Sequence, residues 1–294
     1  MKILLLENKQ EIKEKYIEYL KKNNKIIFFW EEYNSDEVDV IIVRSKIVVD
    51  KELLNKFSEL KFVARVWVWL DKIDLKECEK RGVKVLNTPW VNADSVADLV
   101  LAGVLNLSRN LNKQFLGIEN RFEYMWNQIW WKSVWIIGFW NIWRKIYDRF
   151  KSFWVKNFYI FDPFLKKEDV EKNEFCKFID DKKDLFWLSD IISFHIPLLK
   201  QTKNFLWKEE FSLLKKDVII VNTSRWWIIN ELELIKFLKS NKESRFFADV
   251  WEEENEYKNP KKELLNLENV LITPHIWAMT FQAEEKMHFF EKLV

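Results

Sequence analysis

Apolar runs of strand length alternate with longer charged stretches along most of the chain. The runs are rich in Ile, Val and Leu, as at residues 38–43 and 218–222, and have the length of buried strands. The stretches between them place apolar residues at helical spacing. This alternation is typical of βαβ units and predicts parallel sheets covered by helices. The predicted strands are residues 2–6, 38–43, 61–66, 84–86, 133–138, 157–161, 191–195, 218–222, 245–249 and 270–272.

One apolar stretch is much longer than the others. Residues 92–112 carry valine and leucine at helical spacing, which predicts a long, mostly buried helix joining two domains. The chain has 294 residues, more than the ~100–200 of one typical domain. We therefore expect two doubly wound α/β domains with parallel sheets. One is discontinuous and made of residues 1–92 and 274–294, and the other comprises residues 93–273.

The charge balance and the cysteines exclude several classes of protein. Lys and Arg total 48 against 46 Asp and Glu, so the formal charge of +2 provides no broad basic surface. Cys78 and Cys176 lie far apart and have neither metal-ligand nor disulfide spacing. No stretch reaches the ~18 apolar residues of a membrane span, and the N-terminus lacks the features of a signal peptide. We expect a cytoplasmic protein with a small-molecule partner, no metal, and no nucleic-acid or membrane partner.

A strand-to-helix turn at residues 133–144 carries the clearest motif. With glycine at positions 140 and 143, this segment matches the dinucleotide fingerprint, in which glycines let the backbone approach the pyrophosphate at a helix N-terminus. Asp162 lies 19 residues after Trp143, near the spacing for a carboxylate that binds the adenosine ribose, which favours NAD over NADP. The alternative is an ordinary buried strand and helix that carry two aromatic residues.

Seven further segments accompany this turn, at residues 43–45, 64–74, 87–98, 193–198, 221–227, 248–254 and 273–278. In this order the eight segments resemble the D-isomer-specific 2-hydroxyacid dehydrogenase family over nearly the whole chain, most closely its phosphoglycerate dehydrogenase branch. The resemblance implies a Rossmann-type NAD-binding domain at residues 93–273. It also implies a flavodoxin-like substrate domain made of residues 1–92 and 274–294.

The resemblance implies three catalytic residues. Arg225 would hold the substrate carboxylate and carbonyl, His275 would take the hydroxyl proton, and Glu254 would orient His275. Hydride transfer from a 2-hydroxy acid needs a base, a cation and a fixed nicotinamide, so these residue types fit. Taken singly, Arg225 could be an ion-pair residue, Glu254 part of a solvated acidic run and His275 a loop histidine.

Other residues take binding roles by the same resemblance. Those implied to contact NAD are Gly138, Phe139, Trp140, Asn141, Ile142, Trp143, Asp162, His195, Pro197, Thr202, Thr223, Ser224, Asp249 and Trp277. Those implied to contact the substrate are Arg44, Ser45, Val66, Trp67 and Val68. Asp249 could instead cap a turn, and Arg44 could be a structural ion-pair partner. Lys72 and Asn255 replace the family's usual Asn and Pro, which leaves the identity of the substrate open.

The expected activity is NAD-dependent interconversion of a D-2-hydroxy acid and its 2-oxo acid, with D-3-phosphoglycerate as the favoured substrate. Reduction of hydroxypyruvate, glyoxylate or the oxo acid of D-lactate is the alternative within enzymes. A nonenzymatic NAD-binding co-regulator is an alternative of another class, which the catalytic trio disfavours. A structural protein without a ligand is a third. The resemblance further implies a homodimer through the helix at residues 93–112.

Tryptophan is unusually frequent in this chain and glycine unusually rare. There are 17 Trp and 4 Gly, whereas glycine ordinarily makes up ~7% of residues. Because glycine serves turns and close backbone contacts, tryptophan is a poor replacement for it. We hypothesise that the source organism reads UGA as glycine, whereas this sequence was translated with UGA as tryptophan. The twelve tryptophans at family glycine positions are Trp67, Trp69, Trp90, Trp131, Trp135, Trp140, Trp143, Trp154, Trp207, Trp226, Trp227 and Trp277.

Overall fold

The chain forms two compact units, each described here by itself. One comprises Met1–Asn92 with Thr280–Val294, and the other Ala93–Met279. The chain thus returns to the first unit at Thr280, later than the predicted position 274. The computed structural model describes residues 1–6, 14–44, 47–66, 70, 72–88, 91–111, 121–122, 127–138, 141–162, 167–172, 175–179, 181–251 and 261–287.

The first unit is built on a five-stranded parallel sheet of order β2-β1-β3-β4-β5, the flavodoxin-like order that was predicted. Its strands are β1 (Lys2–Leu5), β2 (Lys25–Phe28), β3 (Val40–Val43), β4 (Phe62–Arg65) and β5 (Lys84–Asn87). Its helical elements include α1 (Glu14–Lys21), η2 (Ser35–Glu37), α2 (Lys51–Leu54), α3 (Leu75–Lys80) and α11 (Phe281–Met287). All four residues of β3 are buried, which makes it the centre of this core.

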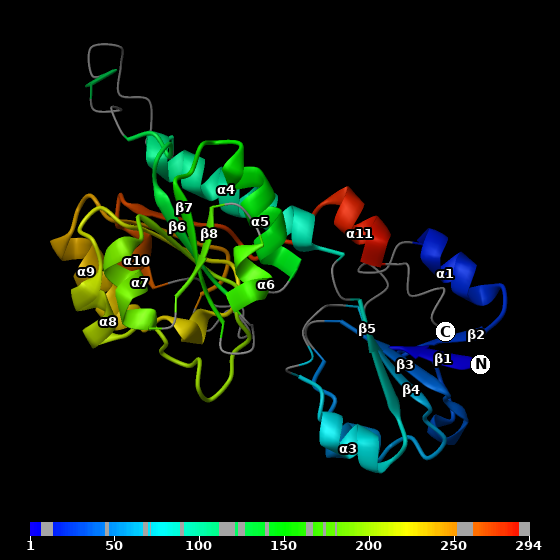
Figure 1. Ribbon diagram of the computed structural model, residues 1–294. Helices are drawn as coiled ribbons and strands as arrows, with labels where there is room; N and C mark the ends of the chain where they lie inside the picture. The colour runs from blue at the N-terminus through cyan, green and yellow to red at the C-terminus, as the bar shows by residue number, and fades with distance from the viewer. Residues whose placement is uncertain are drawn as a thin grey trace. The chain divides into compact units, whose positions relative to one another are not determined.

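The second unit contains a seven-stranded parallel sheet of order β8-β7-β6-β9-β10-β11-β12. Numbered within the unit, this is 3-2-1-4-5-6-7, the doubly wound order of Rossmann folds. In Figure 1, α4, α5 and α6 lie on one side of this sheet and α7 to α10 on the other. The strands are β6 (Ser133–Ile137), β7 (Asn157–Phe161), β8 (Cys176–Phe178), β9 (Ile191–Phe194), β10 (Ile219–Asn222), β11 (Arg245–Ala248) and β12 (Val270–Ile272).

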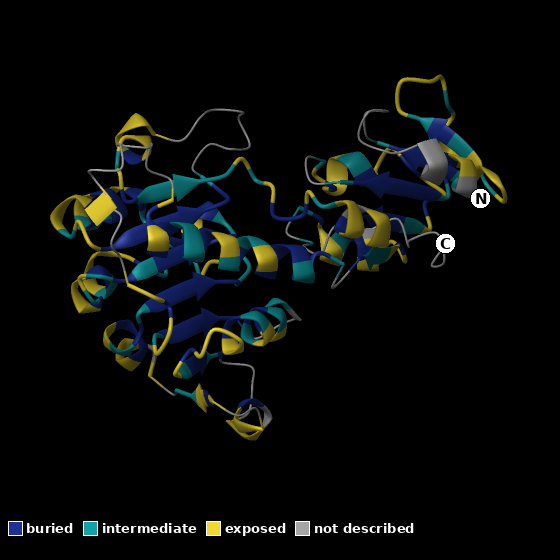
Figure 2. Ribbon diagram, turned by 90° about the horizontal axis from the view of Figure 1, so that it is seen from above, coloured by how far each residue is buried: buried dark blue, intermediate teal, exposed yellow. Residues whose placement is uncertain are grey.

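The helices of the second unit begin with α4 (Ala93–Arg109), the long helix predicted from the sequence. Figure 2 shows much of the sheet in dark blue, whereas the helices beside it carry yellow, exposed sides. All five residues of β6 are buried, as expected for a strand covered on both faces. The other helical elements include α5 (Asn141–Lys151), α6 (Lys167–Glu171), α7 (Lys182–Leu188), α8 (Lys208–Leu213), η4 (Trp226–Ile228), α9 (Glu231–Ser240) and α10 (Lys262–Leu265).

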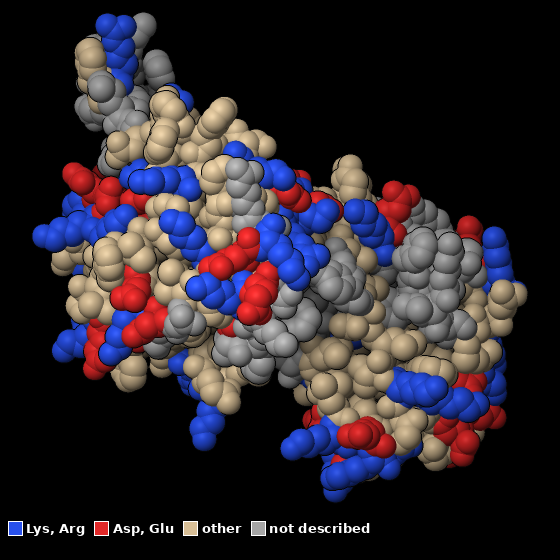
Figure 3. Space-filling model, in the orientation of Figure 1, with Lys and Arg blue, Asp and Glu red and all other residues tan. Residues whose placement is uncertain are grey.

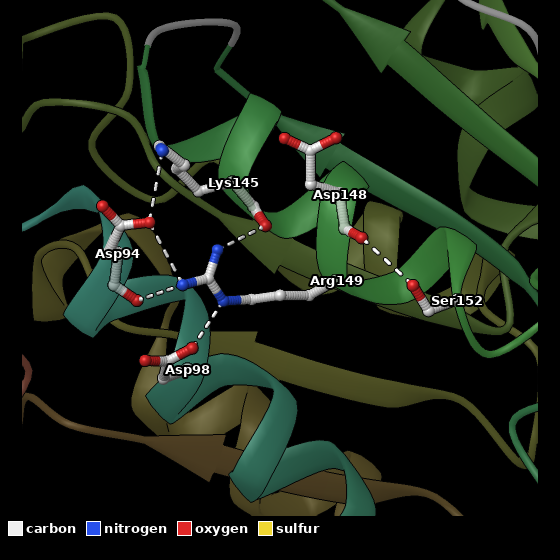
Figure 4. Close-up of polar contacts among 6 residues, drawn as sticks. All are labelled: Asp94, Asp98, Lys145, Asp148, Arg149 and Ser152. Atoms are coloured by element: carbon white, nitrogen blue, oxygen red, sulfur yellow. Dashed lines mark hydrogen bonds and ion pairs between the residues drawn. The ribbon is translucent and has the colours of Figure 1, made fainter.

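Helix α4 lies very close to the sheet. A Cβ atom added at Gly103 would lie 2.3 Å from the side chain of Phe247 on β11, so no larger residue fits without displacing that ring. Polar contacts fix the other side of the helix (Figure 4). Arg149 of α5 donates to Asp98 at 2.5 Å and to the Asp94 carboxylate at 3.2 Å, and Lys145 pairs with Asp94 at 3.2 Å. The first turn of α4 is therefore anchored to α5.

Charged side chains of both signs are interspersed over the face drawn in Figure 3. Within the described part of the chain, no helix has the length and apolar character needed to cross a membrane. The same residues contain no cluster of three or more His, Cys, Asp or Glu suited to a metal ion.

Candidate functional site

The predicted site residues of the second unit gather at one edge of its sheet. Every strand pair in this sheet is parallel, so the carboxyl ends of the strands share that edge. The chain order reverses between β6 and its neighbours β7 and β9, and ligands of doubly wound sheets bind at such a switch point. The residues that follow the strand ends are Gly138, Asp162, His195, Thr223, Ser224, Arg225, Asp249, His275 and Trp277.

The turn between β6 and α5 requires glycine at its first position. Gly138 has a φ of +94°, and a Cβ there would lie 2.5 Å from the carbonyl oxygen of His195. Helix α5 then begins at Asn141, and Ile142 lies in its first turn. Trp143 is almost fully buried, with its ring centroid 6.0 Å from that of Tyr147. The backbone therefore has the strand-turn-helix form of the fingerprint.

His195 follows β9 and is buried. Its Nε2 lies 2.7 Å from Oγ of Ser193, and its backbone N–H donates to the carbonyl of Ile137 at 2.8 Å. Burial lowers the pKa of His195 to about 3, so the imidazole is neutral at physiological pH. Its Nδ1 has no hydrogen-bond partner among the described residues. A neutral imidazole with an unsatisfied nitrogen at this edge is suited to contact a bound molecule.

The turn after β10 carries Arg225. Thr223 and Ser224 are buried there, and Oγ1 of Thr223 has no partner within the described part of the chain. Together with Nδ1 of His195, this gives two buried polar atoms at the switch point that a bound dinucleotide would satisfy. The left-handed φ of Gly138 makes the tight turn that the fingerprint requires of its first glycine. These features fit NAD.

The turn after β12 carries His275 in an unusual backbone conformation. Its φ is 55°, in the left-handed region that is costly for a residue with a side chain. Asp249, fully buried after β11, accepts hydrogen bonds from the N–H groups of Ile276 at 2.9 Å and Trp277 at 2.7 Å. Thr273 donates to the same carboxylate at 2.5 Å. Asp249 therefore fixes the turn from which the His275 side chain leaves.

Burial is the largest influence on Asp249 and raises the pKa of its carboxyl, against the opposing effect of those three hydrogen bonds and of the nearby His275. The predicted cofactor residues Pro197 and Thr202 lie in the loop that follows β9. Thr202 donates to the carbonyl of Pro197 at 2.6 Å and accepts from Leu199 at 2.7 Å, which ties residues 197–202 into one turn.

Two predicted substrate residues belong to the first unit. Arg44 and Val66 directly follow β3 and β4 at the carboxyl edge of the five-stranded sheet. Several other predicted residues lie outside the described part of the chain, namely Ser45, Trp67, Val68, Phe139, Trp140 and Glu254. Of the three predicted catalytic residues, the structure therefore describes Arg225 and His275.

The sequence reasoning missed Asn222, the last residue of β10. It is fully buried, and its side chain makes three hydrogen bonds to the turn that carries Arg225. The sequence offered one signal: a side-chain amide at the end of an apolar strand, followed by Thr and Ser, is suited to bonding nearby backbone.

The comparison with protein families decides the identity of this fold. Residues 100–276 match the family described as D-isomer specific 2-hydroxyacid dehydrogenase, NAD binding domain. The chain belongs to this family. Its members are NAD-dependent oxidoreductases acting on CH–OH donors, and the matched region of this dehydrogenase is the domain that binds NAD. The two parallel-sheet units and the switch-point site agree with that assignment.

Individual relatives differ in their substrates. The dehydrogenase is 34% identical to a hydroxypyruvate reductase of Thermotoga maritima, covering 96% of this chain and 90% of the relative. It is 32% identical to a D-3-phosphoglycerate dehydrogenase of Methanocaldococcus jannaschii, covering 85% of this chain and 47% of that relative, about half its length. A crystal structure of D-lactate dehydrogenase from Aquifex aeolicus, complexed with NAD and lactic acid, has a TM-score of 0.84 at 27% identity, covering 99% and 93% of the two chains.

Proposed function

We propose that this dehydrogenase oxidises a D-2-hydroxy acid, and reduces the corresponding 2-oxo acid, with Arg225 and His275 as catalytic residues. The observation that carries the proposal is that both residues leave turns at the same edge of the sheet as the unsatisfied groups of Thr223 and His195. A dinucleotide at the switch point would have its phosphates at the Gly138 turn and the N-terminus of α5.

Each residue has a separate part in the reaction. The guanidinium of Arg225 binds the carboxylate with two parallel hydrogen bonds and polarises the C2 oxygen. The imidazole of His275 takes the proton of the C2 hydroxyl as the C–H bond breaks and the C=O bond forms. Glu254 orients His275 by the family resemblance. The chemistry that NAD would supply when bound is that of a hydride acceptor for C2, so two electrons would leave the substrate while His275 holds the proton.

The test is turnover in the chain with glycine at the twelve tryptophan positions. His275→Gln should lower kcat by ~10²–10⁴-fold, since it removes the general base. Arg225→Lys should lose comparable activity because an ammonium group cannot make the two-pronged contact. Arg81→Lys is the matched control, since Arg81 pairs with Glu77 at the end of α3. If the protein folds and binds NAD but turns over no 2-hydroxy acid, the proposed enzymatic activity is wrong and the nonenzymatic co-regulator is favoured.

D-3-phosphoglycerate is the proposed substrate. Arg44 directly follows β3 at the carboxyl edge of the sheet of the first unit, and the family resemblance implies that it contacts the substrate. A guanidinium is suited to bind a phosphate group. The hydroxypyruvate reductase matched over 90% of its length supports hydroxypyruvate reduction as a second candidate. Kinetics of Arg44→Ala separate the two. A phosphate role predicts that the variant loses far more kcat/KM with 3-phosphoglycerate than with D-glycerate, whereas equal losses contradict it.

A homodimer through α4 is part of the proposal. Leu101, Ala102 and Leu105 keep part of their surface exposed on the helix that the family resemblance assigns to the interface. Leu105→Glu should convert dimer to monomer in sedimentation experiments, whereas Arg81→Lys should leave the mass unchanged.

A cytoplasmic location agrees with Cys78 and Cys176, both buried thiols without a disulfide. Cell fractionation tests it.

A further inference from the structure

Asn222 lies at the point where β10 ends and the Arg225 turn begins. Its Oδ1 accepts from both the backbone N–H and the hydroxyl of Ser224, at 3.1 and 2.9 Å, and its Nδ2 donates to the carbonyl of Arg225 at 2.9 Å. We propose that Asn222 is a positioning residue for Arg225: it fixes the backbone from which the guanidinium extends. The effect of Asn222 on the turn follows from these contacts, whereas its effect on catalysis rests on the proposed function.

The turn has no regular secondary structure to hold it. Arg225 is extended, with φ −141° and ψ 140°, and it precedes the short helix η4 without making a side-chain cap. Its Nη1 donates to the carbonyl of Ser224 at 2.9 Å. This contact helps to orient the guanidinium, and Asn222 holds the backbone groups on either side of that carbonyl, namely the N–H of Ser224 and the carbonyl of Arg225.

Asn222 is itself rigidly placed. Its Cα is paired in register with Phe194 of β9 and Ala248 of β11, and its carbonyl accepts from the N–H of Asp249 at 3.1 Å. No part of the residue is exposed. Because the side chain of Asn222 is already fixed by burial on a central strand, it loses little further conformational freedom when it bonds the turn. The turn is therefore held in a fixed position relative to the sheet.

The chemistry of the side chain explains why asparagine stands here. The position needs an acceptor for Ser224 and a donor for Arg225 within the reach of one short side chain, and the amide supplies both. Aspartate would match the shape but has no donor for the Arg225 carbonyl, and it would place a charge in the interior. Alanine would leave the buried turn groups without their partner.

The decisive comparison is between Asn222→Asp and Asn269→Asp. Asn269 is a buried asparagine in the turn directly before β12, so it lies at the opposite edge of the same sheet. Its Nδ2 donates to the carbonyls of Leu238 and Ser244 at 3.2 and 2.8 Å. Both variants lose buried amide donors, but only one lies beside Arg225. Asn222→Ser, which keeps an acceptor but no amide donor, is the second variant should Asn222→Asp fail to fold.

Two readouts are needed. Hydrogen exchange of a peptide spanning residues 222–228 should become at least 10-fold faster in the Asn222 variant and stay within 2-fold in Asn269→Asp. With NADH affinity within 3-fold of the parent, kcat/KM for the 2-hydroxy acid should fall at least 30-fold in the Asn222 variant and stay within 3-fold in Asn269→Asp. If Asn222 has only a structural role, the two variants should lose similar stability and both should keep the kcat/KM of the parent.

The outcomes separate this proposal from the proposed function. Unchanged exchange in the Asn222 variant overturns the inference whatever the activity. Faster exchange with unchanged kcat/KM also overturns it, because the turn would then move without consequence. If the parent turns over no 2-hydroxy acid, the proposed function fails. The exchange rates alone then decide whether Asn222 fixes the turn.

Discussion

Trp131 and Trp154 have left-handed backbone conformations, with φ of 64° and 56°. Such φ values cost a residue with a side chain roughly 1–2 kcal/mol and cost glycine almost nothing. Both positions belong to the twelve at which glycine was expected, and the backbone N–H of Trp131 donates to the carbonyl of Trp154 at 3.0 Å. A third member, Trp135, is fully buried on β6 and its indole N–H has no partner among the described residues. The backbone at positions 131 and 154 thus favours glycine.

Replacing either left-handed tryptophan by glycine should stabilise the protein. We expect Trp131→Gly and Trp154→Gly each to raise the free energy of unfolding by about 1 kcal/mol, measured by urea titration. Trp130→Gly is the control, because Trp130 is similarly exposed but lacks a positive φ, and it should lower stability by roughly 0.5–1 kcal/mol. Equal effects of the three substitutions would contradict the backbone argument.

The gene provides an independent test of the same idea. In-frame UGA codons at the twelve positions would support reading UGA as glycine, and the intact mass of the native protein would then be lower than that of the printed sequence. UGG codons at these positions would rule the idea out.

His195 should make stability depend on pH. Its folded pKa of about 3 lies below the unfolded value of 6.5, so its contribution is complete above pH 6.5 and is lost as pH falls toward 3. The slope should be about 1.4 kcal/mol per pH unit within that window. His195→Gln should remove this part of the slope in urea titrations, and His275→Gln, at a partly exposed site, should retain it. Identical slopes in all three proteins would refute the assignment.

At the scale of elements, the contact between α4 and α5 depends on one arginine. The Arg149 side chain is largely buried, whereas its partners Asp94 and Asp98 are 40% and 69% exposed, so solvent weakens the pairs. We expect Arg149→Gln to lower the free energy of unfolding by about 1 kcal/mol. Lys151→Gln, which breaks an exposed pair with Asp148 on the same helix, should change it by less than about 0.5 kcal/mol. Urea unfolding measures both.

All the strands predicted from apolar runs are present, whereas β2 and β8 were missed. The missed strands are short, and each lies at an edge of its sheet. β8 reads Cys-Lys-Phe and lacks the continuous apolar run that marks a buried strand, whereas β2 does lie in such a run, at residues 26–30, and was overlooked. The order of strands in each sheet also followed from the family resemblance, since a pattern of apolar runs does not specify which strands pair.

At the scale of the whole molecule, each unit has its own core. One is centred on residues such as Ile41 and Val63, and the other on residues such as Ile192 and Phe246. The predicted cofactor residues all belong to the second unit. NADH at 100 times its dissociation constant should therefore stabilise that unit by about 2.7 kcal/mol.

Hydrogen exchange can show whether NADH stabilises the second unit more than the first. Amides of β6 and β10 should gain protection on adding NADH, and amides of β1 and β3 should change little. Equal protection of both sheets would show that the two cores open together, contrary to expectation.

The sequence by itself determined the α/β class, the long α4 helix and the positions of most strands, because local spacing and residue type carry that information. Arg225 and His275 stay predicted catalytic residues, named from the family resemblance. The sequence did not reveal how those residues are held. The contacts of Asn222 with the Arg225 turn are local, but their importance depends on burial within a central strand. Asp249 reaches the His275 turn because β11 and β12 pair. Only the tertiary structure decides such contacts, since pairing and burial join groups that the sequence keeps apart.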